Sequence, residues 1–154
     1  MKVAKIVTAV VLLAGMSFPA WSGDHATKDE AMTMVKKAVA FIKQEGTAKA
    51  YATISTKGGQ FSDRDLYVVV YGLDGKVLAH GSKQKLIGKD LIDAQDVDGK
   101  YFVKERVELA RKHAEFWQDY KFVSPQTKKI QPKQMYCQRL NETAVCAGVY
   151  AYKN

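Results

Sequence analysis

The stretch DLYVVVYGLDGKVLAHG, residues 65–81, constrains the fold more than any other part of this sequence. Two β-branched and aromatic runs, 66–71 and 77–80, flank a Leu-Asp-Gly-Lys turn, and Asp-Gly between such runs is a strong β-hairpin signal. Because both faces of the first strand carry large side chains, we expect a central strand covered on both sides. Alternation divides these side chains into two sets: Tyr67, Val69 and Tyr71, and Leu66, Val68 and Val70.

The first 22 residues, MKVAKIVTAVVLLAGMSFPAWS, have the pattern of a secretory signal peptide. Two lysines precede an apolar run over residues 6–15, which is too short to span a membrane comfortably. The small-x-small rule places cleavage after Ser22, with a cut after Ala20 and an uncleaved anchor as alternatives. The sequence therefore predicts an exported protein, periplasmic or secreted, whose mature chain is a single domain of residues 23–154.

The net charge indicates which partners to expect. It is formally +8 and falls to +6 without the two lysines of the predicted signal peptide. A spread basic surface on an exported protein attracts anions, anionic lipid or acidic partners, although a plain solvated surface explains the same charge. No nucleic-acid partner is expected, because no reading motif with interleaved aromatic residues accompanies the lysines.

The remaining elements indicate an α+β fold. A capping box at Thr27–Glu30 begins a helix that ends at Gly46, and a shorter helix covers residues 47–54. A mostly irregular stretch, 82–100, leads to an amphipathic crossover helix over residues 102–113. The order of helices and strands predicts one mainly antiparallel sheet with helices packed against it. The last three strands are predicted at 116–122, 133–140 and 144–150.

The two cysteines, Cys137 and Cys146, lie in the last predicted hairpin. A turn at Asn141-Glu142 would place them directly opposite each other in a non-hydrogen-bonded pair, where Cα atoms approach closely. That separation suits a disulfide, and an oxidising compartment lets it persist. A longer turn would shift the register and leave free thiols. No CxxC spacing indicates a redox role.

Residues that would indicate catalysis or metal binding are sparse. His25, His80 and His113 lack metal-ligand spacing, and His25 is expected in a flexible N-terminal tail. There is no GxSxG, HExxH, CxxCH or phosphate-binding glycine loop. Residues 93–99, DAQDVDG, are only faintly like a calcium loop, since Lys104 stands where a glutamate is needed. We expect no enzyme, metal or cofactor; an enzyme with His80 as general base is a minor alternative.

Aromatic and cationic residues on the strands suggest a pocket for a small organic acid. Aromatic walls exclude water, hydroxyl groups fix orientation and one cation balances a carboxylate. The alternative is that the aromatic residues simply fill the core. Lys133 discriminates between the two, because a strand lysine either faces solvent or pairs with an anion. The set from the strands is Tyr67, Tyr71, His80, Trp117, Tyr120, Lys133 and Tyr136.

Taken together, the sequence resembles the single Cache domain family, an extracytoplasmic relative of the PAS fold. The resemblance runs from about Asp24 to Tyr152. It rests on "AMTMVKKAVAFIKQEG", "GQFSDRDLYVVVYGLDGKVLAHG", "LIGKDLIDAQDVDGKYFVKERVELA", "FWQDYKF" and "KKIQPKQMYCQRL…VCAGVYA". It implies a long N-terminal helix, a five-stranded antiparallel sheet, and a small carboxylate or amino acid bound on the concave face of the sheet.

The resemblance also implies roles for individual residues. Arg64 is expected in structural ion pairs, with an anion clamp as the alternative, and Phe102 and Lys89 are candidates from the segment that covers the pocket. The pocket itself is implied to contain Tyr67, His80, Trp117, Tyr120, Lys133 and Tyr136.

Two features depart from the usual plan of the family. No transmembrane helix or signalling domain follows the domain, and the cysteine pair is unexpected. A free-standing sensor module would pass its occupancy to a membrane chemoreceptor or histidine kinase, with the N-terminal helix as the moving or homodimerising element. The alternative is an envelope interaction or structural protein with a closed pocket, which binds a protein partner through its basic surface.

Overall fold

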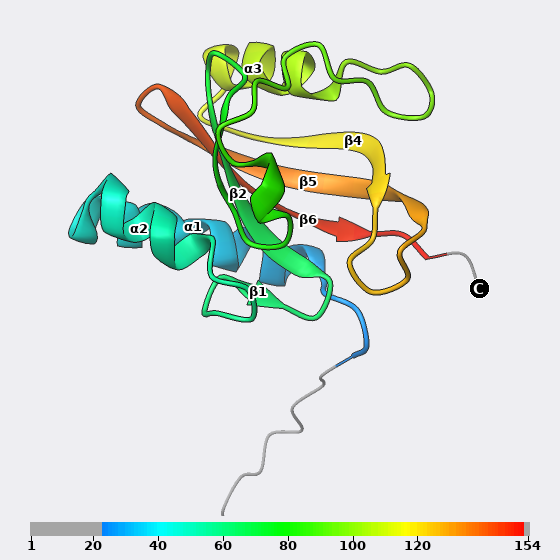
Figure 1. Cartoon of the computed structure of the whole chain (residues 1–154), viewed down its shortest axis with the longest axis horizontal. Coiled ribbons are helices and arrows are strands. Elements are labelled where there is room, and N and C mark those ends of the chain that lie inside the picture. The colour runs from blue at the N-terminus through cyan, green and yellow to red at the C-terminus, as the bar shows by residue number, and fades with distance from the viewer. Residues whose placement is uncertain (1–22, 153–154) are drawn as a thin grey trace, which may run out of the picture.

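The computed structural model describes residues 23–152, in which helices cover both faces of one antiparallel sheet (Figure 1). The predicted signal peptide, residues 1–22, lies outside the described residues. No helix within the described part of the chain is long and apolar enough to cross a membrane. The predicted α+β class is confirmed.

The helices begin and end where the sequence predicts. α1 (Lys28–Glu45) starts with a complete capping box, in which the Thr27 side chain accepts from the Glu30 N–H and the Glu30 carboxylate accepts from the Thr27 N–H. It ends at Gly46, whose φ of 78° favours glycine. α2 (Thr47–Ile54) follows directly, and α3 (Phe102–Lys112) is the crossover helix.

The sheet contains the five predicted strands and one short addition. Every pairing is antiparallel, in the order β1-β2-β6-β5-β4, with β3 also paired to β2. The additional strand is the two-residue β1, and the stretch between β3 and α3 is mostly irregular apart from the short 3₁₀ turn η1 (Gln84–Leu86). The strands are β1 (Ser62–Asp63), β2 (Leu66–Gly72), β3 (Val77–His80), β4 (Glu115–Val123), β5 (Ile130–Leu140) and β6 (Thr143–Tyr150).

The register of the last hairpin confirms the predicted disulfide. Leu140 pairs with Thr143 across the turn, so Cys137 stands directly opposite Cys146. The two cysteines form a disulfide with their Cα atoms 4.1 Å apart. It links β5 to β6 in the middle of the sheet.

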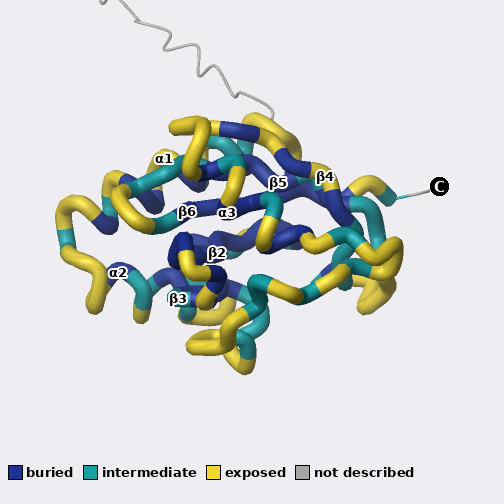
Figure 2. Tube along the Cα trace, turned by 90° about the horizontal axis from the view of Figure 1, so that it is seen from above, coloured by how far each residue is buried: buried dark blue, intermediate teal, exposed yellow. Residues whose placement is uncertain are grey.

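The central strand β2 is buried along its whole length, as its two large faces predicted. Leu66, Val68 and Val70 join a core with α1 and α2, and Tyr67, Val69 and Tyr71 join a second core with α3. Figure 2 shows β2, β5 and β6 as a buried layer, with exposed residues gathered on the outer faces of the helices and in the loops. We call the two cores the α1-side layer and the α3-side layer.

The N-terminal segment before α1 is held against the body of the protein, which corrects the expectation of a flexible tail. The His25 ring stacks on Tyr152 with 3.8 Å between ring centres, and its Nδ1 lies 3.1 Å from Gln126 Oε1. The buried Asp65 carboxylate accepts from the Ala26 N–H (2.9 Å) and the Tyr152 hydroxyl (2.9 Å). These contacts were not visible in the sequence because they join residues far apart in the chain.

Candidate functional site

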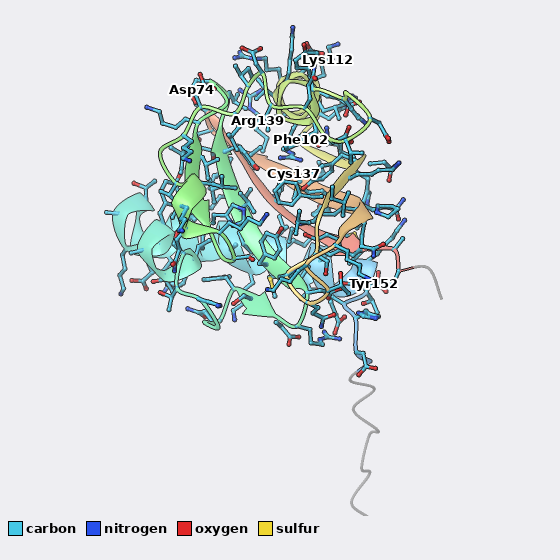
Figure 3. The ribbon with its side chains drawn as sticks, turned by 45° about the vertical axis from the view of Figure 1, so that its right-hand side comes forward. Asp74, Phe102, Lys112, Cys137, Arg139 and Tyr152 are labelled. Carbon is cyan, nitrogen blue, oxygen red and sulfur yellow. A yellow bond between two sulfur atoms is a disulfide. The ribbon has the colours of Figure 1, made fainter. Side chains whose placement is uncertain are left out.

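Three basic side chains are buried in the α3-side layer among the described residues. Lys133 on β5 is 1% exposed, His80 on β3 is 1% exposed, and Arg106 on α3 is 0% exposed. Figure 3 shows how α3 supplies the upper wall of this layer, with Phe102 directed toward the sheet and Lys112 directed away from it. Burial of such groups is costly unless each finds a partner, so their surroundings decide what the layer can do.

Lys133 points inward, as the pocket interpretation requires. Its Nζ lies 2.9 Å from the Tyr67 hydroxyl and 3.2 Å from the Tyr150 hydroxyl, over both rings at 4.1 and 4.6 Å from their centres. Within residues 23–152, no carboxylate forms a salt bridge with it. Burial, reinforced by the charge of Arg106 and partly opposed by Asp65, holds the pKa of Lys133 well below its usual range.

Arg106 is the second buried cation. Its guanidinium carbon lies 4.8 Å from the centre of the Tyr71 ring and 5.0 Å from that of Tyr120. Its Nε donates to Gln118 Oε1 at 3.0 Å, whereas Nη1 and Nη2 have no hydrogen-bond partner among the described residues. Aromatic faces compensate a buried cation only in part, so these two nitrogens remain ready to bind an anion.

The sequence interpretation missed Arg106, although its position carried a signal. Phe102, Val103, Val107 and Ala110 mark the buried face of α3, and Arg106 falls on the same face by the helical period. A cation on an apolar stripe is a reason to expect a buried partner for it.

His80 presents a neutral ring to the same layer. It pairs with Val69 across the hairpin and stacks on Tyr67 with 5.1 Å between ring centres. Its Nδ1 accepts from the backbone N–H groups of Ser82 (3.2 Å) and Lys83 (2.9 Å), so the ring hydrogen is on Nε2. Burial, with the charges of neighbouring cations, lowers the pKa of His80 to about 3. The imidazole therefore acts as a fixed donor near neutral pH.

Tyrosine and phenylalanine rings complete the walls. Phe102 stacks on Tyr120 with 4.9 Å between ring centres, and the Tyr120 hydroxyl donates to Met135 Sδ at 3.8 Å. Burial raises the pKa of Tyr67, Tyr120 and Tyr150, so all three hydroxyls stay protonated and can orient a polar ligand. Of the residues expected in the pocket, the structure brings together Tyr67, His80, Phe102, Tyr120 and Lys133.

Trp117 and Tyr136 do not belong to this layer. They pair with each other across β4 and β5 on the opposite face, where Tyr136 joins the α1-side layer and Trp117 is 36% exposed beneath Lys28. The reason is strand geometry: each lies three residues from a pocket member, and residues an odd number apart point to opposite faces. One pocket cannot contain all six residues of the expected set.

Lys89 and Arg64 also lie outside the layer. Lys89 is exposed in the loop after η1. Arg64 is engaged in ion pairs, with Nη2 2.5 Å from Glu30 Oε1 and 2.8 Å from Asp63 Oδ2, and its Nη1 donates to backbone carbonyls of the N-terminal segment. These are the structural ion pairs expected for Arg64, which also lines the surface cleft described below.

A surface cleft of about 290 Å³ lies next to the α3-side layer. Tyr67 and Gly81 line it. Tyr67 is the residue whose hydroxyl accepts from Lys133, and Gly81 follows His80 at the end of β3. Exposed Lys57 and Lys128 stand at its rim. The cleft thus borders the α3-side layer at Tyr67.

Solved structures share this fold. A methyl-accepting chemotaxis protein from Vibrio parahaemolyticus RIMD 2210633 has a TM-score of 0.69 at 20% identity, over 80% of this chain and 87% of that one. A periplasmic sensor domain of a chemotaxis protein has a TM-score of 0.64 at 21% identity, over 80% and 90%. A Cache chemosensory domain, studied for carboxylic acid recognition, has a TM-score of 0.67 at 21% identity, over 80% and 92%.

No curated protein sequence matches the chain. The family model described as Single Cache domain 2 matches residues 20–153, which is nearly the whole sequence and all of the described structure. The predicted resemblance is confirmed, and this chain belongs to the single Cache domain 2 family.

Proposed function

We propose that this protein is an exported, ligand-binding sensor domain that holds a small carboxylate between α3 and the sheet. One observation carries the proposal: Arg106 and Lys133 are both buried on this face without a carboxylate partner among the described residues. Leaving a guanidinium buried with unpaired donors costs on the order of several kcal/mol. An incoming carboxylate converts that cost into binding free energy.

The two free nitrogens of Arg106 define the recognition geometry. Nη1 and Nη2 are the fork that binds a carboxylate through two parallel hydrogen bonds. The rings of Tyr71 and Tyr120 flank the guanidinium and keep water away from it. His80 adds a neutral donor whose tautomer is set by its backbone contacts. The arrangement supports recognition of one small anion with an apolar body.

The cationic surroundings of the cleft support the same ligand class. Lys57 and Lys128 at the rim attract anions toward the opening. Lys83, over the Phe122 ring at 4.5 Å, adds a further positive charge on this side of the sheet. Side chains pack closely around Lys133 behind Tyr67, so binding must separate α3 from the sheet or move the loop after β3. Such a movement is what a sensor requires, because a ligand signals only by favouring one conformation.

Family membership supports the wider role. Single Cache domains are extracytoplasmic sensor domains, and the solved relatives belong to chemotaxis proteins, one of them studied for carboxylic acid recognition. We infer that residues 23–154 are the mature domain after removal of a signal peptide. The domain would pass its occupancy to a membrane chemoreceptor or histidine kinase, with α1 as the moving or homodimerising element.

A thermal-shift screen, followed by calorimetric titration, tests the proposal on the mature protein. The panel is straight-chain carboxylates of two to six carbons and the common amino acids. We expect one chemical class to raise the melting temperature in a saturating way. A flat response on folded, ligand-free protein would reject carboxylate binding and favour the alternative, a protein partner for the basic surface.

Two matched variants locate the site. Arg106→Met should weaken binding of the best ligand at least about 30-fold, because truncating one partner of a buried charge pair costs about 2–5 kcal/mol. Arg111→Met removes the same charge from the same helix at an exposed position and should change affinity less than about twofold. Equal effects of the two substitutions would place the ligand elsewhere.

A further inference from the structure

The hydrogen bonds around Lys133 run in one direction only. The Tyr150 hydroxyl donates its single hydrogen to the Val123 carbonyl at 3.0 Å. At the Tyr67–Tyr150 contact of 2.9 Å, Tyr67 must therefore be the donor. The hydrogen of Tyr67 is then used, so both hydroxyls can only accept from Lys133 Nζ, at 2.9 and 3.2 Å.

This polarity matches a neutral amine. A neutral lysine has two hydrogens to donate, and the two hydroxyl groups accept both. An ammonium has a third hydrogen, which finds no acceptor among the described residues. The remaining tetrahedral position of Nζ therefore holds the lone pair of a neutral amine in the ligand-free protein. In an ammonium it would hold an N–H, which a bound anion could accept.

The groups that face Lys133 from each neighbouring element favour the same state. Three of these groups are cations or hydrogen-bond donors, and four are aromatic rings. The eighth is a carboxylate, which already accepts hydrogen bonds from the Ala26 N–H and the Tyr152 hydroxyl. They are Arg106 from α3, His80 from β3, Lys83 after it, Tyr67 from β2, Tyr120 and Phe122 from β4, Tyr150 from β6, and Asp65 before β2.

The buried charges then balance in both states. In the ligand-free protein Arg106 carries +1 and Asp65 carries −1, with Lys133 and His80 neutral. A bound monocarboxylate adds −1, and protonation of Lys133 restores neutrality. A dicarboxylate would leave one buried negative charge without a partner, which is costly in a low-dielectric layer.

We propose that the site takes a monocarboxylate together with one proton, which Lys133 accepts from solvent as its neutral amine becomes an ammonium. The step forms one N–H bond, breaks no covalent bond in the ligand and ends in an ammonium–carboxylate ion pair. Lys133 is thereby the residue that selects one carboxylate over two. This inference rests on the proposed carboxylate function and adds the ligand charge and its coupling to pH.

The direction of the pKa shift at Lys133 agrees with the hydrogen-bond geometry. Burial and the charge of Arg106 both favour the uncharged amine. Binding with uptake of one proton weakens as pH rises, by about tenfold in Kd per pH unit above the pKa of the ligand-free amine. A site with a permanently charged lysine would show no such slope near neutral pH.

Calorimetric titration of the full mature chain tests the proposal. The probes are the tightest-binding monocarboxylate from the panel and the dicarboxylate of the same carbon number, for example butyrate and succinate. Titration at pH 7.5 in buffers with different heats of ionisation gives the number of protons bound. We expect net proton uptake on binding of the monocarboxylate, a Kd that rises with pH, and weaker binding of the dicarboxylate.

Three substitutions assign the proton. Lys133→Met removes the titrating group, so residual binding should lose its proton uptake, and Lys133→Arg keeps a permanent charge and should bind without uptake. Lys104→Met, an exposed lysine on α3, is the matched control and should behave like wild type. Each variant is first shown to be folded by its cooperative thermal transition.

The outcomes separate the two proposals. Monocarboxylate binding without proton uptake, or tighter binding of the dicarboxylate, would overturn the inference and leave the carboxylate function standing. Proton uptake that persists in Lys133→Met would also overturn it, because another group would then be the acceptor. Failure of every carboxylate to bind would reject the proposed function itself.

Discussion

On the α1 side of the sheet, Val35, Ala38 and Ile42 pack against Val68 and Val145 in an apolar core, whereas on the α3 side the same strands present hydroxyls and nitrogens. Strand alternation produces the difference, since neighbouring residues of β2, β5 and β6 face opposite layers. The buried basic side chains Lys133 and Arg106 both lie in the α3-side layer.

The two layers therefore contribute differently to the stability of the fold and to ligand binding. Close-packed aliphatic side chains stabilise a fold through burial alone and need no further partner. Buried donors and cations stabilise it only when they are paired, so incomplete pairing in one layer leaves free energy for a ligand. A protein with one layer of each kind can bind a ligand in one without unfolding the other.

The largest expected effect tests the α1-side layer. Ile54→Ala removes a fully buried side chain of α2 and should lower the free energy of unfolding by about 3 kcal/mol. Denaturant unfolding measures the loss, and Ile54→Val should cost only about 1 kcal/mol. Affinity for the ligand should be unchanged in both. A loss of affinity without a loss of stability would contradict the separation of the two layers.

Removal of the disulfide should come next in size. Replacing Cys137 and Cys146 together by alanine opens a link between residues nine apart in sequence, which should cost about 2–3 kcal/mol of stability. Denaturant unfolding with and without reductant checks this. The wild type under reductant should match the double variant, and the double variant should not respond to reductant.

Lys133→Met should change stability in the opposite direction. Replacing a buried amine, which the folded protein holds in its neutral form, by an apolar side chain of similar length should raise the free energy of unfolding by about 2 kcal/mol at pH 7. The pKa of Lys133 is lowered in the folded state, so the wild type gains stability as pH rises toward the usual lysine range near 10.5. The advantage of the variant should therefore shrink with increasing pH. A destabilised variant at pH 7 would show that Lys133 is already well paired.

His80 should make the α3-side layer sensitive to acid. Its pKa is about 3 in the folded protein against 6.5 in the unfolded chain, so the folded state binds fewer protons between these values. Stability present above pH 6.5 is then lost as pH falls, by up to about 1.4 kcal/mol per pH unit. Thermal melts from pH 7 to 4 measure the slope, and His80→Asn, which does not titrate, should flatten it.

The smallest expected effect lies at the start of α1. Thr27→Ala removes the capping hydrogen bond to the Glu30 N–H and should cost about 1 kcal/mol. Thr27→Ser retains the hydroxyl and should cost less than half as much. Thermal unfolding compares the two, and neither substitution should alter ligand affinity. A change in affinity would show that the start of α1 is coupled to the α3-side layer.

Several features of the fold could be predicted because they depend on neighbours in the sequence. The capping box at Thr27–Glu30, the Asp-Gly hairpin and the cysteine register each follow from short-range geometry, and the structure confirms all three. The candidate site was predicted less well. Lys133 and His80 lie in the layer expected for them, but Trp117 and Tyr136 were assigned to it against the alternation of their own strands.

By itself, the sequence determined the elements, their order, the family and the two faces of β2, since hydrophobic period and turn chemistry act over a few residues. Only the tertiary structure decided that Lys133 faces inward, that its amine meets Tyr67 and Tyr150, and that α3 carries Arg106 over Tyr71. These contacts join residues up to 66 positions apart. Long-range packing sets such contacts, and no local pattern encodes which buried cation is left without a partner.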